Sequence, residues 1–450
     1  MAKKETTIQD LQLAIIQPHT AAIDIGSMLM MVAYSDAEGK QHLLETDGFT
    51  ESLDILAQTL VDAGTTDVAM EATGVYWMSL YEVLEQKGLK VVLINPSHFK
   101  NVHAQKTDVK DCQWIQQLHA HGLLRASHIA PELFRELKCY IHERNILQKQ
   151  KADTLNRIQR TLTLMNIKVQ HLISDIEGVS GMILVRGISE GIKDPESLLS
   201  MIDITKLKAS EDDLKKSLQG IYKQQYITVL KLSLESFDFF KKQMNVYEKL
   251  IEEVLIKMLP EDESGNKPVI EKKKGHVRKN QYNINMKSYL QHIKGTDITQ
   301  VDGMEEITIL EIISVTGTDM SKWKTAEHFA SWLNLSPRPN ISGGKTLGHQ
   351  KRFTNNKATQ AFRMAAQTMW QHKGALGNLY RRLAAQKGSK KAVKAIARKL
   401  AVIFYNMMKH KTPYDKSKLE SSAEKQEAKK IAYLQKELKK HGYDSQRIIT

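Results

Sequence analysis

Four acidic residues in the first quarter of the chain have the types and spacing of a metal-dependent site for phosphodiester chemistry. Asp24 and Glu71 each end an apolar run, and Asp108 and Asp111 are three residues apart. A helix would carry the last two on one face. Magnesium prefers hard oxygen ligands, and two ions about 3.5–4 Å apart stabilise the attacking and leaving oxygens of a phosphodiester displacement. The four carboxylates are therefore candidate ligands for two magnesium ions.

Each acid alone also has an ordinary structural interpretation. An Asp shortly before a Gly, as in Asp24-Ile25-Gly26, is often a turn residue. Asp108 alone is typical of a helix start. The combination is more specific than its parts, because two strand-end acids and an i, i+3 pair occur in one order of elements.

A second candidate group lies far along the chain, in the polar stretch Asn340–Lys345. Ser342 precedes two glycines, Gly343 and Gly344, which let a backbone approach a ligand closely. Its hydroxyl could attack a phosphodiester once a base or a metal activates it. Three cations could hold the phosphate: Lys345, Lys351 and Arg352. On spacing alone, a flexible surface loop with two glycines is the favoured interpretation.

The segment that carries the four acids alternates between strands and helices. This order is that of the ribonuclease H fold, in which the first and fourth strands are neighbours, so that Asp24 and Glu71 converge. The expected strands are Ala21–Ile25, Met28–Ala33, Gln41–Glu45, Asp67–Glu71 and Lys90–Asn95, and the expected helices are Glu51–Ala63, Trp77–Gln86 and one from an N-cap at Thr107 to about His121.

The rest of the chain is mostly helical. Residues 131–176 predict one long helix with a coiled-coil-like stripe, and a second stripe follows before Pro260. Asp302-Gly303-Met304 begins a unit that resembles a helix-hairpin-helix, whose turns commonly contact DNA phosphates. Later helices are expected at Thr359–Gln371, Leu376–Lys409 and Lys416–Lys440. The stripes are Leu155, Ile158, Leu162 and Met165, then Tyr247, Ile251, Val254 and Met258. The expected domains are 1–130, 131–300, 301–410 and a basic helical tail over 411–450.

Charge favours a nucleic-acid partner. The net charge is +14, and 19 Lys/Arg against 6 Asp/Glu place +13 of it between Arg381 and Thr450. A second basic block spans Lys272–Lys279. Basic faces attract phosphate backbones, although a solvated tail is the plain alternative. Two cysteines, no 18-residue apolar run and no apolar core in MAKKETTIQDLQ predict a cytoplasmic protein without a membrane span or secretory signal.

Several motifs together resemble the DEDD-type insertion-sequence transposases, a family of bridge-RNA-guided recombinases. The resemblance runs from about residue 20 to 410. It includes an expanded segment at 190–300, and Asn355-Asn356-Lys357 stands where many relatives have Lys-x-Gly-Asn. The matching motifs are Ala22-Ile23-Asp24-Ile25-Gly26, Met70-Glu71-Ala72-Thr73-Gly74, Asn95-Pro96, Lys106-Thr107-Asp108-Val109-Lys110-Asp111, Asp302-Gly303, Leu335-Ser336-Pro337, Ser342-Gly343-Gly344-Lys345 and Ala361-Phe362-Arg363-Met364-Ala365-Ala366.

The resemblance implies a RuvC-like N-terminal domain whose four acids bind Mg²⁺ and a C-terminal domain whose Ser342 forms a 5′-phosphoserine link to DNA. It also implies donor and target DNA as substrates, a noncoding bridge RNA as guide, and homodimers that assemble into tetramers in a prokaryotic cytoplasm, at the nucleoid. Residues assigned to nucleic-acid binding are Gly343, Gly344, Lys345, Lys351, Arg352 and Arg363.

Three other classes of protein stay open on the residues. A Holliday-junction-resolvase-like nuclease would use the four acids with water as the nucleophile. A sugar-kinase-type phosphotransferase shares Asp-x-Gly on a related sheet, but would need a second glycine-rich phosphate loop that the sequence lacks. A non-catalytic nucleic-acid-binding protein would use only the coiled coil and the basic tail.

Overall fold

The chain divides into two compact units, Met1–Ile129 and Ala130–Thr450. The computed structural model describes residues 14–72, 74–95, 108–273, 275, 279–337, 339–349 and 356–440. Among the helices that it describes, none has the length and apolar character needed to cross a membrane.

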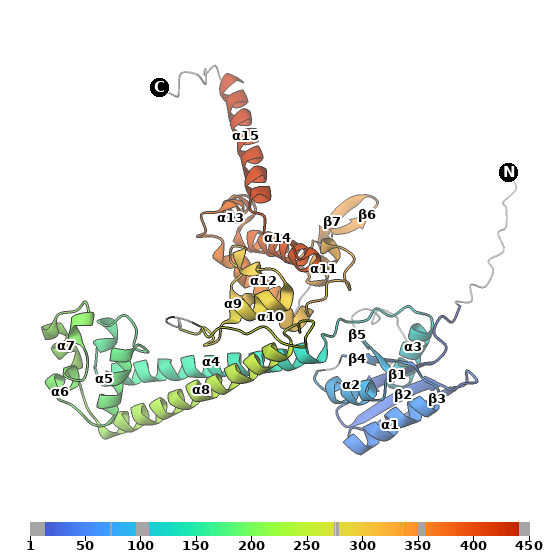
Figure 1. Cartoon of the computed structure of the whole chain (residues 1–450), viewed down its shortest axis with the longest axis horizontal. Coiled ribbons are helices and arrows are strands. Elements are labelled where there is room, and N and C mark those ends of the chain that lie inside the picture. Colours follow the sequence, from blue (N-terminus) through green and yellow to red (C-terminus); the bar gives the residue numbers. More distant parts are fainter. Residues whose placement is uncertain are drawn as a thin grey trace. The chain divides into compact units, whose positions relative to one another are not determined.

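A five-stranded mixed sheet forms the centre of the first unit (Figure 1), with the order β3-β2-β1-β4-β5. β1, β2 and β3 are antiparallel neighbours, whereas β4 and β5 run parallel to β1. The expected ribonuclease-H-like order is confirmed, with strand ends shifted by one or two residues. The strands are β1 Thr20–Ile25, β2 Leu29–Ser35, β3 Gln41–Asp47, β4 Asp67–Glu71 and β5 Lys90–Ile94.

Helices cover both faces of this sheet, and the side-chain alternation of the strands decides what each face meets. Ile23 and its neighbours at every second position pack against α1 and α2. Ala22 and the equivalent small residues of the other strands pack against Cys112 and Ile115 of α3, on the opposite face. These helices are α1 Thr50–Asp62, α2 Trp77–Gln86 and α3 Asp108–Ala120. The N-cap expected at Thr107 lies outside the described residues.

Two long helices, α4 (Glu132–Leu164) and α8 (Gln224–Lys257), lie side by side in the second unit (Figure 1). Each contributes to two separate cores. The end of α4 and the start of α8 pack with a helical tip, whereas the opposite ends pack into the C-terminal core. Between them the tip contains 3₁₀ turns at Val169–His171 and Ile204–Lys206, and helices α5 Val179–Ser189, α6 Pro195–Leu199 and α7 Glu211–Leu218.

The helix expected over 131–176 ends twelve residues early, at Leu164. Asn166 adopts a left-handed backbone with φ of 56°, a conformation that commonly ends a helix. Ile167 and Val169 then turn into the tip core, where they are fully buried. The two apolar stripes do not meet along one coiled coil, because the first lies in the tip core and Ile251 and Val254 of the second lie in the C-terminal core.

The two long helices α4 and α8 form an arm. The C-terminal core contains the ends of this arm that lie away from the tip, together with helices that follow α8. Phe329 of α11 contacts Phe362 of α12 and Phe404 of α14, and these rings form its centre. The helix expected over Leu376–Lys409 is interrupted at Gly388, whose φ of +83° separates α13 from α14. The helices are α9 Met286–Lys294, α10 Glu306–Thr316, α11 Ala326–Trp332, α12 Lys357–Thr368, α13 Ala375–Lys387, α14 Ser389–His410 and α15 Ser417–Lys440, with a 3₁₀ turn at Ile298–Gln300.

The turn expected to resemble a helix-hairpin-helix lies between α9 and α10 and packs against α12. Gly303 has a φ of +77°. A Cβ built on it would come within 3.0 Å of the Ala365 backbone oxygen. A side chain at this position would therefore separate the turn from α12.

Candidate functional site

Asp24 and Glu71 lie next to each other on neighbouring parallel strands. The last paired residues of β1 and β4 are Ile23 and Met70, and each acid is the next residue along its strand. Alternation places both acids on the face that Ala22 shares with α3, opposite the apolar face of Ile23. Both side chains are half-buried. The expected convergence of the first and fourth strands thus brings two carboxylates to one edge of the sheet.

Cys112 fixes the start of α3 against this edge. Its thiol donates to the carbonyl oxygens of Ala22 and Met31, at 3.2 and 3.1 Å. Burial raises the pKa of the Cys112 thiol to about 12, and the negative charge of Asp24 adds to this rise. The thiol therefore stays protonated at physiological pH, and its single proton is shared between the two carbonyl oxygens. We did not expect this role from the sequence, in which a lone cysteine after Asp111 gave no signal beyond its apolar helical spacing.

Asp108 and Asp111 both belong to the first turn of α3, as their spacing predicts. Asp111 is half-buried and directly precedes Cys112, whereas the side chain of Asp108 lies outside the described structure. Among the side chains that are described, no three His, Cys, Asp or Glu residues lie close enough together to hold one metal ion. The structure thus places Asp24 and Glu71 at the ends of neighbouring strands with α3 beside them, and the four-acid cluster stays a prediction.

Ser342 lies on a β-hairpin, which corrects the expectation of a flexible loop. β6 (Pro339–Ser342) pairs antiparallel with β7 (Lys345–His349), and Ser342 is opposite Lys345. Gly343 and Gly344 have φ values of +53° and +76°, which is the pattern of the type I′ turn that suits a two-residue hairpin. Two glycines between strand-forming residues were the available signal for this hairpin.

The glycines are required by backbone conformation and not by space. A Cβ built on either Gly343 or Gly344 meets no atom within 4 Å. Ser342 and Lys345 are exposed on either side of the turn, and Arg363 is exposed on α12. Lys351 and Arg352, the two other cations assigned to phosphate binding, lie outside the described residues.

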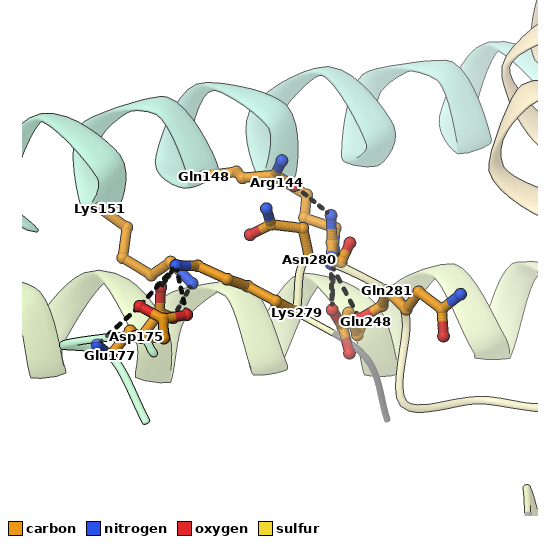
Figure 2. A network of polar contacts seen from close by, with 9 residues as sticks. All are labelled: Arg144, Gln148, Lys151, Asp175, Glu177, Glu248, Lys279, Asn280 and Gln281. Carbon is orange, nitrogen blue, oxygen red and sulfur yellow. Dashed lines mark hydrogen bonds and ion pairs between the residues drawn. The ribbon is translucent and has the colours of Figure 1, made fainter. Parts of the chain in front are cut away.

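A network of buried ion pairs holds the middle of the arm together (Figure 2). Arg144 of α4 donates through Nε and Nη2 to Glu248 Oε1 of α8, at 2.8 and 2.6 Å. Nearby, Lys151 and Lys279 both contact Glu177, at 2.6 and 2.9 Å. Burial alone would raise the pKa of Glu177, but these two ammonium groups hold it below its usual value.

This network also bears on the basic block at 272–279. Lys279 is engaged by Glu177 and by Asp175 at 3.0 Å, and Lys273 donates to the carbonyl oxygen of Tyr282 at 3.0 Å. These two cations therefore contact the protein itself: Lys279 attaches the segment to the loop of Asp175 and Glu177, and Lys273 forms a contact within the segment.

Comparison with protein families connects both units to DNA transposition. Residues 21–167 match a transposase model of the DEDD, IS110 type, and residues 296–381 match the model described as transposase IS116/IS110/IS902 family. The two matched segments together take up just over half of the chain. No curated protein matches it.

The mixed sheet with its carboxylate pair and the helical C-terminal unit are the two parts of a DNA transposase. The chain belongs to the IS110-type DEDD transposase family. Its substrate is DNA, so the family decides against a sugar kinase and against a protein without catalytic activity. The matched N-terminal segment includes Asp24, Glu71, Asp108 and Asp111, and the C-terminal one includes the hairpin of Ser342.

Proposed function

We propose that this transposase cuts and rejoins donor and target DNA through a covalent link between Ser342 and a 5′ phosphate, assisted by magnesium on its four N-terminal acids. The observation that carries the proposal is the placement of Asp24 and Glu71 side by side at one edge of the sheet, under the start of α3. The exposed serine beside a tight two-residue hairpin turn supports the second part.

The donor set suits magnesium. This ion is commonly held by one or two protein carboxylates, with water and substrate phosphate oxygens completing its shell. The neighbouring carboxylates of Asp24 and Glu71 meet that need, and in the proposal Asp108 and Asp111 complete a site for two ions. When bound, the ions would supply positive charge that stabilises the phosphate as it reacts.

The serine step conserves the energy of the phosphodiester bond. The Ser342 hydroxyl loses its proton as its oxygen attacks phosphorus. A bond forms between Oγ and phosphorus, the bond from phosphorus to the 3′ oxygen breaks, and that oxygen takes up a proton and leaves as a hydroxyl. In the reverse step the 3′ hydroxyl of another strand attacks the phosphoserine and frees Ser342. Lys345, opposite Ser342 on the hairpin, provides positive charge for the phosphate.

The serine is tested by trapping adducts between protein and DNA under denaturing conditions. We expect Ser342→Ala to abolish these adducts while nucleic-acid binding persists. Thr346→Ala is the matched control, because Thr346 is an exposed hydroxyl on the same hairpin. Adducts that persist at wild-type levels in Ser342→Ala would remove the serine from the scheme.

The remaining alternative is a RuvC-like endonuclease of the Holliday-junction-resolvase type, in which water replaces the serine. The carboxylate pair favours it equally, since both mechanisms use the same edge of the sheet. Cleavage by Ser342→Ala without any adduct would support the nuclease, whereas loss of cleavage together with the adduct supports the recombinase.

RNA guidance and assembly are further parts of the proposal. The basic C-terminal segment and the family resemblance support a noncoding bridge RNA, and we propose a homodimer that forms a tetramer on DNA in the prokaryotic cytoplasm, at the nucleoid. Purification with the DNA flanking the gene expressed in the same cells tests both points. A specific RNA should copurify, and light scattering should give the mass of two or four chains; a monomer free of RNA would contradict them.

A further inference from the structure

The hairpin that carries Ser342 exposes two large apolar side chains. Ile341 is 64% exposed and Leu347 is 74% exposed. Every residue from Pro339 to Leu347 is exposed, so both faces of this ribbon meet solvent. A two-stranded hairpin alone is marginally stable in water, so a ligand that covered its apolar side chains would also stabilise it.

A β-bulge sets Leu347 beside the paired positions Ile341 and Thr346. Asn340 pairs with Gly348 and Ile341 with Thr346, so Leu347 is an extra residue in β7. Without the bulge Leu347 would stand directly opposite Asn340. With it, Thr346 and Leu347 both oppose Ile341. Bulges are common next to active sites, where they redirect a side chain.

The charge of the hairpin indicates what covers it. Its only charged residue at neutral pH is Lys345, and it contains no acid. A two-stranded ribbon fits a groove of duplex DNA, and proteins that distort DNA insert Ile, Leu or Met between base steps. Because Ser342 directly follows Ile341 in β6, DNA that reaches the serine also reaches the apolar pair.

We propose that Ile341 and Leu347 form a wedge that enters the DNA beside the cut and unstacks the adjacent base pairs. This inference rests on the proposed role of Ser342. Rejoining a strand to a new partner requires the bases next to the break to leave their old partners. Unstacking costs a few kcal/mol per base step, and the wedge would supply apolar contacts for the exposed bases.

The test uses the full-length protein and a duplex that spans the junction of the element with its flank, with RNA transcribed from that junction added. 2-Aminopurine placed beside the cut becomes brighter when it is unstacked. We expect a rise in fluorescence with the wild type and with Ser342→Ala. The double variant Ile341→Thr, Leu347→Thr keeps strand-forming residues and should bind the duplex without that rise.

Two control variants separate the wedge from general effects. Leu347→Met keeps an apolar side chain and should retain the rise. Val269→Thr changes a side chain that is 93% exposed outside the hairpin and should behave as wild type. A full fluorescence rise in the double variant would overturn the wedge. If the double variant also lost oligomer mass in that case, the pair would contact another subunit in place of DNA. Adducts in Ser342→Ala would instead refute the serine mechanism while the wedge signal persisted.

Discussion

The carboxylates of Asp24 and Glu71 each stand one residue beyond the last paired position of β1 and β4, Ile23 opposite Met70. Two like charges on adjacent strands repel each other, and in the proposed function a bound metal ion would offset that repulsion. The pair is therefore the part of the N-terminal unit whose removal should affect chemistry more than folding.

Asp24→Asn preserves the shape of the side chain and removes its charge. We expect strand cleavage to fall by at least roughly 100-fold, because a metal ion contributes several kcal/mol to stabilising the reacting phosphate. The melting temperature should not fall, since one of two neighbouring negative charges is lost. Gel assays of cleavage check the first point. Glu45→Gln, an exposed acid in β3, is the control and should cleave normally; equal activity of the two variants would contradict the role of Asp24.

The type I′ turn makes opposite predictions for two substitutions of Gly343. Gly343→Val places a β-branched residue at a φ of +53° and should destabilise the hairpin by roughly 1–2 kcal/mol. Gly343→Asn should be tolerated, because Asn-Gly is the preferred pair in this turn. Adduct yield measures both. Equal yields from Val and Asn would show that the turn does not position Ser342.

The buried pair of Arg144 and Glu248 predicts a non-additive effect on stability. Their side chains are 2% and 8% exposed, so Arg144→Met alone should cost about 3–5 kcal/mol by leaving Glu248 charged and unpaired. The double variant with Glu248→Met should recover most of this loss. The part not recovered belongs to groups that the double variant leaves without their partners, such as the backbone N–H of Asn283, which donates to Glu248 at 3.0 Å, and Gln148 Oε1, which accepts from Arg144 at 3.0 Å. Denaturant melts of both single variants and the double variant give the coupling energy. Stability losses that simply add would contradict the predicted coupling.

Lys294 predicts a dependence of stability on pH. Its ammonium is fully buried in the C-terminal core, with no hydrogen-bond partner among the described residues, and burial lowers its pKa well below 10.5. Between the lowered pKa of folded Lys294 and about 10.5, the unfolded chain binds this proton and the folded chain does not. The stability of the protein therefore rises with pH over that range. Lys294→Met should stabilise the protein by about 1–3 kcal/mol at pH 7 and flatten this rise. Melting temperatures at pH 7 and 9.5 measure it, and a less stable variant at pH 7 would contradict it.

The sheet was predictable because strand patterns and turn residues are local. Asp67–Glu71 and Trp77–Gln86 have the same bounds in the sequence interpretation and in the structure. The end of α4 before Asn166 was not predictable from local pattern. The left-handed turn at Asn166 directs Ile167 and Val169 into the tip core, whose other members lie farther along the chain. Apolar spacing continues past that point, so periodicity alone could not reveal the turn.

In the candidate site, too, the part that depends on strand order was predictable and the part that depends on packing was not. The edge that Asp24 and Glu71 share follows from strand order, which the sequence suggested. The role of Cys112 depends on the packing of α3 against carbonyl oxygens of β1 and β2, and no spacing encodes such a contact. Glycines in a polar stretch predict a flexible loop, but two in succession also define a tight turn, which is what the structure has.

The chain leaves the C-terminal core along α4 and returns to it along α8, and the near side of the helical tip is also held by the ion pairs of Lys279 with Asp175 and Glu177. A module connected in this way can be lengthened, trimmed or exchanged with little effect on the fold that supports it. Evolution and protein engineers can therefore vary the far end of the arm independently, and a fluorescent domain or an affinity tag inserted there should leave the rest of the unit intact.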